Sequence, residues 1–456
     1  MDTKSAEQRK YLSLWSQIAF GMGDGGCNCF SAFVSAFVLI YMTDAVGMNA
    51  GVIGTLMMLS RLLDGISDVL FGRIMDKTHT KLGKARPWFI GSAFPLAIST
   101  VLLFMIPNSA SSTIQYVYFF IIYTFANAIC YTANNISYTS LVALATKNPN
   151  ERVQMGVFRF VVVTLVYIPI NAATIPMVSA FGGGIAGWRS TAIVYAICLV
   201  VMQCICFLFV KELPEENKTE ELKTASLSFL EMLKIVLSNK YYVIILAITI
   251  LNYITSTILS TMGVYYCTYI LHNAEFLGIL SLAVMATVVG IVCTPFITKR
   301  IGIYKTNLIG YGVSAVIGIP IILFGYKAAG MAVFVLMALR YFLQAPYAAT
   351  SAALIADVST YTEYKDGVKM DGMMFSCSSM GIKVGSGLGV AISGFLLNLG
   401  GYVGTADEQT QAALNMINFT YLIVPAITIA VVVWLLYEFK VHKVLKAYQA
   451  ETVSAE

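Results

Sequence analysis

Two aspartates, Asp64 and Asp68, stand inside an apolar stretch over residues 50–75 that is long enough to cross a membrane. A spacing of four places both carboxylates on one helix face, with Arg61 one turn earlier on the same side. Because a charge at bilayer depth is costly, such residues usually face a partner or a cavity. Two acids and one base leave a surplus negative charge, which a captured cation or a proton can balance. The pattern predicts cation coupling; the alternative is a purely structural Arg–Asp pair.

Other charged residues at membrane depth are few, and they are Asp24, Arg159, Arg340, Asp357 and Lys383. Lys383 falls about twelve residues into its segment, about 18 Å from the start of a helix and so near mid-membrane. If that helix neighbours the one that carries Asp64, the ammonium group competes with a bound cation for the same carboxylates. Such competition can couple cation occupancy to a conformational change. The alternative is a permanent salt bridge.

Residues 130–140, with the sequence CYTANNISYTS, concentrate amides, hydroxyls and aromatic rings in one apolar segment. Together with Arg159, these groups suit a polyhydroxylated ligand such as a sugar, because amides both donate and accept hydrogen bonds. The Tyr131 ring can stack on a pyranose face. The alternative for each Ser, Thr or Asn is a hydrogen bond between helices.

The chain has 456 residues, of which 58% are hydrophobic and 12% charged, whereas soluble domains carry about 25% charged residues. This composition predicts an all-α integral membrane protein. The polar start has no signal-peptide core or cleavage site, so we expect the first hydrophobic helix to direct insertion. We expect twelve transmembrane helices, at residues 14–41, 49–75, 87–107, 115–145, 154–180, 188–210, 241–271, 275–298, 304–326, 330–357, 372–399 and 412–439.

Lys and Arg residues concentrate at the two termini and in alternate loops, which predicts that both termini are cytoplasmic. The longest hydrophilic stretch, residues 211–240, separates six segments from six. We therefore expect an N-terminal six-helix bundle over 1–210, a cytoplasmic linker over 211–240, and a C-terminal six-helix bundle with a short tail over 241–456. Two such halves point to a repeated transporter architecture.

Several other classes of protein are not expected. The three histidines fall in loops or at a helix end, and the nine cysteines show no metal-ligand spacing, so we predict neither an enzyme nor a cofactor. The formal charge of +5 is modest, and the positions of the Lys and Arg residues follow the rule for cytoplasmic loops of membrane proteins. The charge therefore does not indicate a nucleic-acid partner.

The loop GRIMDKTHTKLGKARPW at residues 72–88 resembles the short basic loop after the second helix of major facilitator superfamily transporters. With RLLDGISD, GMGDGGCN, YMTDAVGM, ADVSTYTEYKDGVKMDG and GGYVGTADEQTQAALNMI in order, nearly the whole chain resembles the glycoside–pentoside–hexuronide:cation symporter family. The resemblance implies the major facilitator superfamily fold, with two six-helix bundles around a central cavity.

The resemblance also implies roles for individual residues. Asp64 and Asp68, with Thr132 and Ser67, would form the cation site, and the two aspartates would be the metal ligands if the ion is Na⁺. Substrate would contact Asn28, Tyr131, Asn135, Arg159 and Lys383. Coupling or gating would involve Arg61, Lys383, Asp357 and Asp76.

Three departures from a melibiose-transporting member leave substrate and ion open. Asn28 and Asn135 replace sugar-contacting carboxylates, and Ser67 replaces an Asn near the cation. The lost negative charge favours an anionic sugar such as a hexuronide, but a neutral glycoside or pentoside fits the family equally well.

We therefore expect symport of a glycoside, pentoside or hexuronide with Na⁺ or H⁺, by a monomer in the inner or plasma membrane. The partners would be a small sugar or glycoside, a monovalent cation and the lipid bilayer. The alternatives are a cation-coupled carrier of a lysolipid and a non-transporting membrane sensor or enzyme on the same fold.

Overall fold

The computed structural model describes residues 10–107, 109–213, 229–366, 371–406 and 408–445. These residues form helices and include no named strand; one isolated β-bridge joins Thr80 and Gly83. Twelve helical segments of the described part are long and apolar enough to cross a membrane. They start at Leu14 and end at Leu445. The predicted all-α membrane fold with twelve spans is confirmed.

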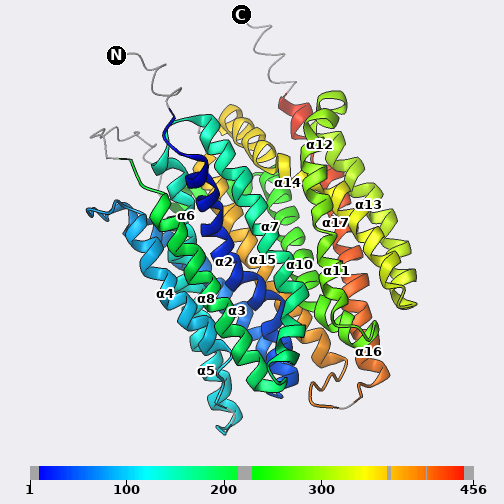
Figure 1. The fold of residues 1–456 in the computed structure, drawn as a ribbon. Coiled ribbons are helices and arrows are strands. Elements are labelled where there is room, and N and C mark those ends of the chain that lie inside the picture. The colour runs from blue at the N-terminus through cyan, green and yellow to red at the C-terminus, as the bar shows by residue number, and fades with distance from the viewer. Residues whose placement is uncertain (1–9, 108, 214–228, 367–370, 407, 446–456) are drawn as a thin grey trace, which may run out of the picture. The chain divides into compact units, whose positions relative to one another are not determined.

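Figure 1 shows the helices in chain order. The first six spans comprise α2 (Leu14–Ile40), η1 (Tyr41–Ala45), α3 (Ala50–Asp76), α4 (Arg86–Leu103), α5 (Ser112–Thr124), η2 (Phe125–Tyr131), α6 (Thr132–Ala145), α7 (Pro149–Ala180) and α8 (Gly184–Phe209). The short helix α9 (Phe229–Ser238) lies within the predicted linker. The remaining spans comprise α10 (Lys240–Tyr265), η3 (Tyr266–Ile270), α11 (Phe276–Leu282), α12 (Met285–Ile301), α13 (Ile303–Tyr326), α14 (Gly330–Asp366), α15 (Asp371–Leu399), α16 (Gln411–Asn418), η4 (Phe419–Ile423) and α17 (Val424–Glu438).

The chain divides into two compact units, and unit 1 takes in segments from both halves of the sequence. Unit 1 consists of Met1–Asn217 together with Ser260–Ser281 and Val390–Ile417. Unit 2 consists of Lys218–Leu259, Leu282–Gly389 and Asn418–Glu456. Ends of α10 and α15 thus pack with the N-terminal helices. The predicted division into six-helix halves at 211–240 stays a prediction.

In unit 1, α2 packs chiefly against α7 and α8, beside which it lies in Figure 1. Two glycines allow this close approach. A Cβ at Gly21 would lie 2.7 Å from the backbone oxygen of Phe158 on α7, and one at Gly23 would lie 2.8 Å from Cys206 Sγ on α8. The contact brings Asp24, the next residue of α2, to the helix that carries Arg159.

Local sequence determines where α2 and α3 begin, and these two helices carry half of the predicted site residues. The Ser13 side chain caps α2 by accepting from the Ser16 amide, and Asn49 caps α3 by accepting from the Val52 amide. Between α5 and α6 the chain forms η2, a π-helical segment that ends immediately before Thr132. Such segments often occur at functional sites, because they reorient the side chains that follow.

In unit 2, α14 packs against α12 and α13, and α13 packs against α17. Large side chains fill the space between these helices and α10. The Tyr311 and Tyr347 rings, for example, meet edge to face with their centroids 5.8 Å apart.

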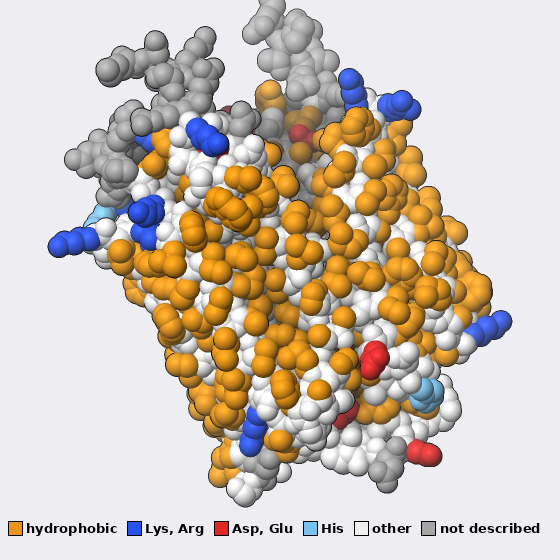
Figure 2. Space-filling model, viewed as in Figure 1, with side chains coloured by type: hydrophobic (Ala, Val, Ile, Leu, Met, Phe, Trp, Pro, Cys, Tyr) orange, Lys and Arg blue, Asp and Glu red, His pale blue; other side chains and the backbone are white. Residues whose placement is uncertain are grey.

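The outward helix faces carry exposed apolar side chains, including Leu165 and Phe296 at 67% and 72% exposure. Figure 2 shows such side chains over most of the visible flank of the helices. Exposed apolar surface of this extent is expected where lipid, rather than water, covers the protein.

Candidate functional site

The first polar cluster in unit 1 joins α3 to α6. Asp64 is buried, with 2% of its surface exposed. Thr132 donates its hydroxyl proton to Asp64 Oδ1 at 2.6 Å, and Arg61 Nη1 lies 3.8 Å from Asp64 Oδ2. Ser67 Oγ donates to the backbone oxygen of Asp64 at 2.9 Å and lies 3.4 Å from Thr132 Oγ1. The structure therefore brings Arg61, Asp64, Ser67 and Thr132 together, as predicted from the sequence.

This cluster offers the oxygen ligands that hard cations take. The Arg61–Asp64 separation of 3.8 Å exceeds a hydrogen bond, so the guanidinium acts on the carboxylate through its charge. Asp68 follows one helical turn later and is half-buried. The described residues contain no group of three or more His, Cys, Asp or Glu side chains that could hold a metal ion. A cation here would depend on hydroxyl and carboxylate oxygens together.

The second cluster in unit 1 joins α2 to α7. Arg159 Nε donates to Asp24 Oδ2 at 2.6 Å, and the guanidinium carbon lies 5.5 Å from the centre of the Tyr138 ring. Asp24 is 6% exposed, whereas 39% of the Arg159 side chain is exposed. The pair places a cation beside the predicted sugar-contacting residues. Sequence reasoning named both residues but did not pair them; two opposite charges at membrane depth were the available signal.

Three further residues predicted to contact substrate differ in how they are held. Asn28 Nδ2 donates to the backbone oxygen of Asp24 at 2.9 Å, and its Oδ1 accepts from Ser31 at 3.4 Å. The half-buried Tyr131 ring lies 5.7 Å from the Phe30 ring. Asn135 is half-buried, and no described residue makes a hydrogen bond to its side-chain amide. The Asn135 amide is therefore open to a ligand.

Asn134, the neighbour of Asn135, has a structural role. Its Nδ2 donates to the backbone oxygen of Phe89 and to Ser92 Oγ, and it exchanges two hydrogen bonds with the Gln203 amide at 2.6 and 2.7 Å. Asn134 Oδ1 also accepts from the Cys27 thiol. These contacts tie α6 to α2, α4 and α8. For Asn134, the structure therefore favours hydrogen bonding between helices over sugar binding.

A third network, around Asp44, was not anticipated from the sequence. Asp44 Oδ1 accepts from Thr43 and Tyr402, and Oδ2 accepts from Tyr269 at 2.6 Å. Thr43 also shares a hydrogen bond with Tyr265. All of these residues belong to unit 1. Asp44 lies beyond the predicted end of the first span at residue 41. An acidic residue in a loop is common, so nothing in the sequence indicates a buried network there.

The remaining predicted residues lie in unit 2 or outside the described side chains. Lys383 lies on α15 and Asp357 on α14, and both are half-buried. The predicted action of Lys383 on Asp64 and Asp68 stays a prediction, as does the predicted role of Asp357 in coupling or gating. The Asp76 side chain lies outside the described part of the chain.

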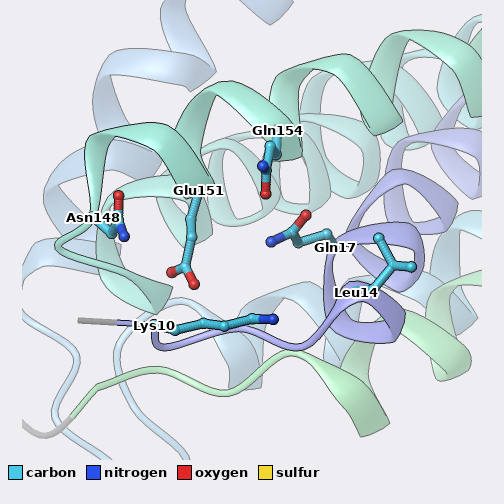
Figure 3. A pocket seen from close by; sticks show the side chains of 6 residues that line it. All are labelled: Lys10, Leu14, Gln17, Asn148, Glu151 and Gln154. Carbon is cyan, nitrogen blue, oxygen red and sulfur yellow. The ribbon is translucent and has the colours of Figure 1, made fainter. Parts of the chain in front are cut away.

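A pocket of about 490 Å³ opens near the start of α2 and the start of α7. Its lining is Lys10, Leu14, Gln17, Asn148, Glu151 and Gln154, and Figure 3 shows Gln17 and Lys10 extending below the Glu151 and Gln154 side chains. The Glu151 carboxylate accepts from the backbone amides of Tyr11 and Leu12. None of the lining residues belongs to the predicted cation or sugar site.

Comparison with known proteins identifies the family. An isoprimeverose transporter of Lactiplantibacillus pentosus is 30% identical over 95% of this chain and 90% of its own length. An inner membrane symporter of Escherichia coli (strain K12) is 28% identical over 91% and 89% of the two chains. The crystal structure of a D-xylose–proton symporter, 13% identical, matches 94% of this chain and 98% of its own with a TM-score of 0.66, which shows a shared fold. The model of the MFS/sugar transport protein family matches residues 19–443, and the chain belongs to this family.

Proposed function

We propose that this chain is a secondary transporter that couples the entry of a monovalent cation to the uptake of a sugar or glycoside. The observation that carries the proposal is the buried Asp64 carboxylate, which accepts from Thr132 at 2.6 Å within a membrane span. A buried acid in a membrane helix is a functional candidate by default, because its charge must be balanced. The family and its named transporters support the same class.

The cation site is formed by Asp64, Asp68, Ser67 and Thr132, and the coupling ion is Na⁺ or H⁺. Thr132 donates to Asp64, and rotation of its hydroxyl turns a lone pair toward an incoming cation. Arg61 offsets part of the carboxylate charge at 3.8 Å, which limits the affinity and allows release.

The sugar site is formed by Asn135, Tyr131, Asn28 and Arg159. The open Asn135 amide supplies one donor and one acceptor for a pair of sugar hydroxyls. The Asp24–Arg159 pair supplies charged donors and acceptors, whose hydrogen bonds are stronger than those between neutral groups. Lys383 would take part in coupling sugar occupancy to cation occupancy.

The protein functions as a monomer in the inner or plasma membrane with both termini in the cytoplasm. The alternating distribution of Lys and Arg among the loops supports this orientation. The partners are the sugar, the cation and the bilayer, with no nucleic acid.

Uptake into liposomes tests the proposal. Purified protein is reconstituted, and accumulation of labelled isoprimeverose, xylose and a β-glucuronide is measured under imposed Na⁺ or H⁺ gradients. We expect one gradient to drive accumulation above the external concentration, and Asp64→Asn to abolish it. Equal uptake with and without either gradient for every transported sugar would exclude symport.

A further inference from the structure

Arg340 on α14 is a buried cation that the proposed sugar and cation sites do not use. It is 3% exposed and lies ten residues into the helix, about 15 Å from its start and near mid-membrane. Its Nε has no hydrogen-bond partner, and no described carboxylate lies within salt-bridge distance of it. An unpaired buried charge is costly, so Arg340 needs a negatively charged partner that none of the described residues supplies.

The neighbours of Arg340 cannot supply this charge. The guanidinium lies within electrostatic reach of Tyr311, Tyr341 and Tyr421, which carry neutral phenol groups. The Tyr311 hydroxyl donates its own proton to Asn252 Oδ1 at 2.9 Å. Tyrosine rings and hydroxyls can surround a cation, but they leave its full charge in place.

Two further side chains, one on the same helix as Arg340 and one bonded to its neighbour Tyr311, also present unused donors. Gln344 follows one turn later on the same face of α14, and its Nε2 has no partner. Asn252 Nδ2 is unpartnered as well, because the bond from Tyr311 uses only the amide oxygen. Arg340 Nε, Gln344 Nε2 and Asn252 Nδ2 are all buried donors, so the group that satisfies them must be rich in acceptors and negatively charged.

We propose that Arg340, Gln344 and Asn252 form a subsite in unit 2 for an anionic oxygen group, namely the carboxylate of a transported sugar acid. All three residues belong to unit 2. Arg159, the other candidate partner for a substrate carboxylate, already binds Asp24 at 2.6 Å. That the carboxylate belongs to a sugar rests on the proposed function; a small free carboxylate such as acetate shares its chemistry.

Thermal unfolding of the full-length protein tests whether Arg340 is unbalanced without a ligand. Arg340→Met removes a buried, unpaired charge, so we expect a Tm equal to or above that of the parent protein in carboxylate-free buffer. Arg159→Met is the matched control, because it breaks an ion pair and should lower the Tm. Acetate or glucuronate should raise the Tm of the parent protein and leave that of Arg340→Met unchanged.

Calorimetry with two matched glycosides tests the substrate class. p-Nitrophenyl β-D-glucuronide and p-nitrophenyl β-D-glucoside differ only at the carboxylate. We expect Arg340→Met to weaken the glucuronide at least about tenfold more than the glucoside, the typical effect of losing a charged hydrogen bond. Gln344→Leu should produce a smaller loss in the same direction.

The outcomes separate this inference from the proposed function. A lowered Tm in Arg340→Met, like that of Arg159→Met, would overturn the subsite, as would equal losses for both glycosides. If the parent protein binds neither glycoside, the sugar assignment fails. In that case, acetate decides the matter. If acetate raises the Tm of the parent protein but not that of Arg340→Met, the anion subsite is supported; if acetate does not raise the Tm of the parent protein, the subsite is overturned.

Discussion

The Tyr402 hydroxyl donates a hydrogen bond to Asp44 Oδ1 at 2.5 Å, although 358 positions separate the two residues. Burial raises the pKa of Tyr402, so its hydroxyl stays protonated and remains a donor. Tyr269 donates to the other carboxylate oxygen. The network therefore ties the end of the first membrane span to two segments from the second half of the sequence within one compact unit.

Replacing Asp44 should destabilise unit 1. Asp44→Ala removes the acceptor shared by Thr43, Tyr269 and Tyr402, and one charged hydrogen bond contributes about 1.5–3 kcal/mol. We expect a lower Tm for the purified protein, with smaller decreases for Tyr269→Phe and Tyr402→Phe because each removes one donor. A Tm for Asp44→Ala equal to that of the parent protein would show that the network contributes little to stability.

The sequence predicts local features of the fold well. The expected second span at 49–75 corresponds to α3 at Ala50–Asp76, and the expected ninth at 304–326 corresponds to α13 at Ile303–Tyr326. Hydropathy determines these limits, because a helix must bury about 20 apolar residues to cross the bilayer. The four-residue spacing of Asp64 and Asp68 likewise predicts that both side chains lie on one face of a helix, and both residues belong to α3.

Pairings between distant residues could not be derived in this way. Asp24 and Arg159 are 135 positions apart, and helix periodicity carries no information on which helices touch. The π-helical segment before Thr132 could not be predicted either, because no residue pattern in the sequence indicates it. Asn134 and Asn135 look alike in the sequence, and only their contacts separate a structural amide from an open one.

Asp64 and Thr132 should govern cation affinity. Thr132→Val removes the hydroxyl that lies 2.6 Å from the carboxylate and that would ligate Na⁺, so we expect Na⁺ affinity to fall about tenfold, the typical effect of one charged hydrogen bond. Thr132→Ser keeps the hydroxyl and should retain most of the affinity. The concentration of Na⁺ that gives half-maximal uptake measures the effect. Equal values for the Val and Ser variants would remove Thr132 from the cation site.

The two adjacent amides should respond in opposite ways to truncation. Asn134→Ala breaks the buried bonds to Gln203, Ser92 and Phe89, and each unsatisfied group costs about 1–3 kcal/mol, so the Tm should fall. Asn135→Ala breaks no bond to a described side chain, so the Tm should hold while sugar affinity falls. Thermal unfolding and sugar calorimetry on both variants check this contrast. A destabilised Asn135→Ala with normal sugar affinity would contradict it.

Arg159 should serve both stability and sugar binding, and its partner allows the two effects to be separated. Arg159→Ala leaves the Asp24 carboxylate, which is 6% exposed, without its partner, and this should lower the free energy of unfolding. Because the guanidinium is partly exposed and its charge is screened by solvent, we expect a decrease of only about 1–3 kcal/mol. Adding Asp24→Asn removes the unpaired charge, so the double variant should regain most of the lost stability.

Sugar affinity then decides the role of Arg159. If its guanidinium contacts the substrate, the double variant stays weak in binding even though its Tm recovers, because the donor to the sugar is still missing. If Arg159 only holds Asp24 and the helix pair in place, affinity recovers together with stability. We expect the first result, measured by calorimetry at the coupling-ion concentration that saturates the parent protein. Full recovery of sugar affinity in the double variant would assign Arg159 a purely structural role.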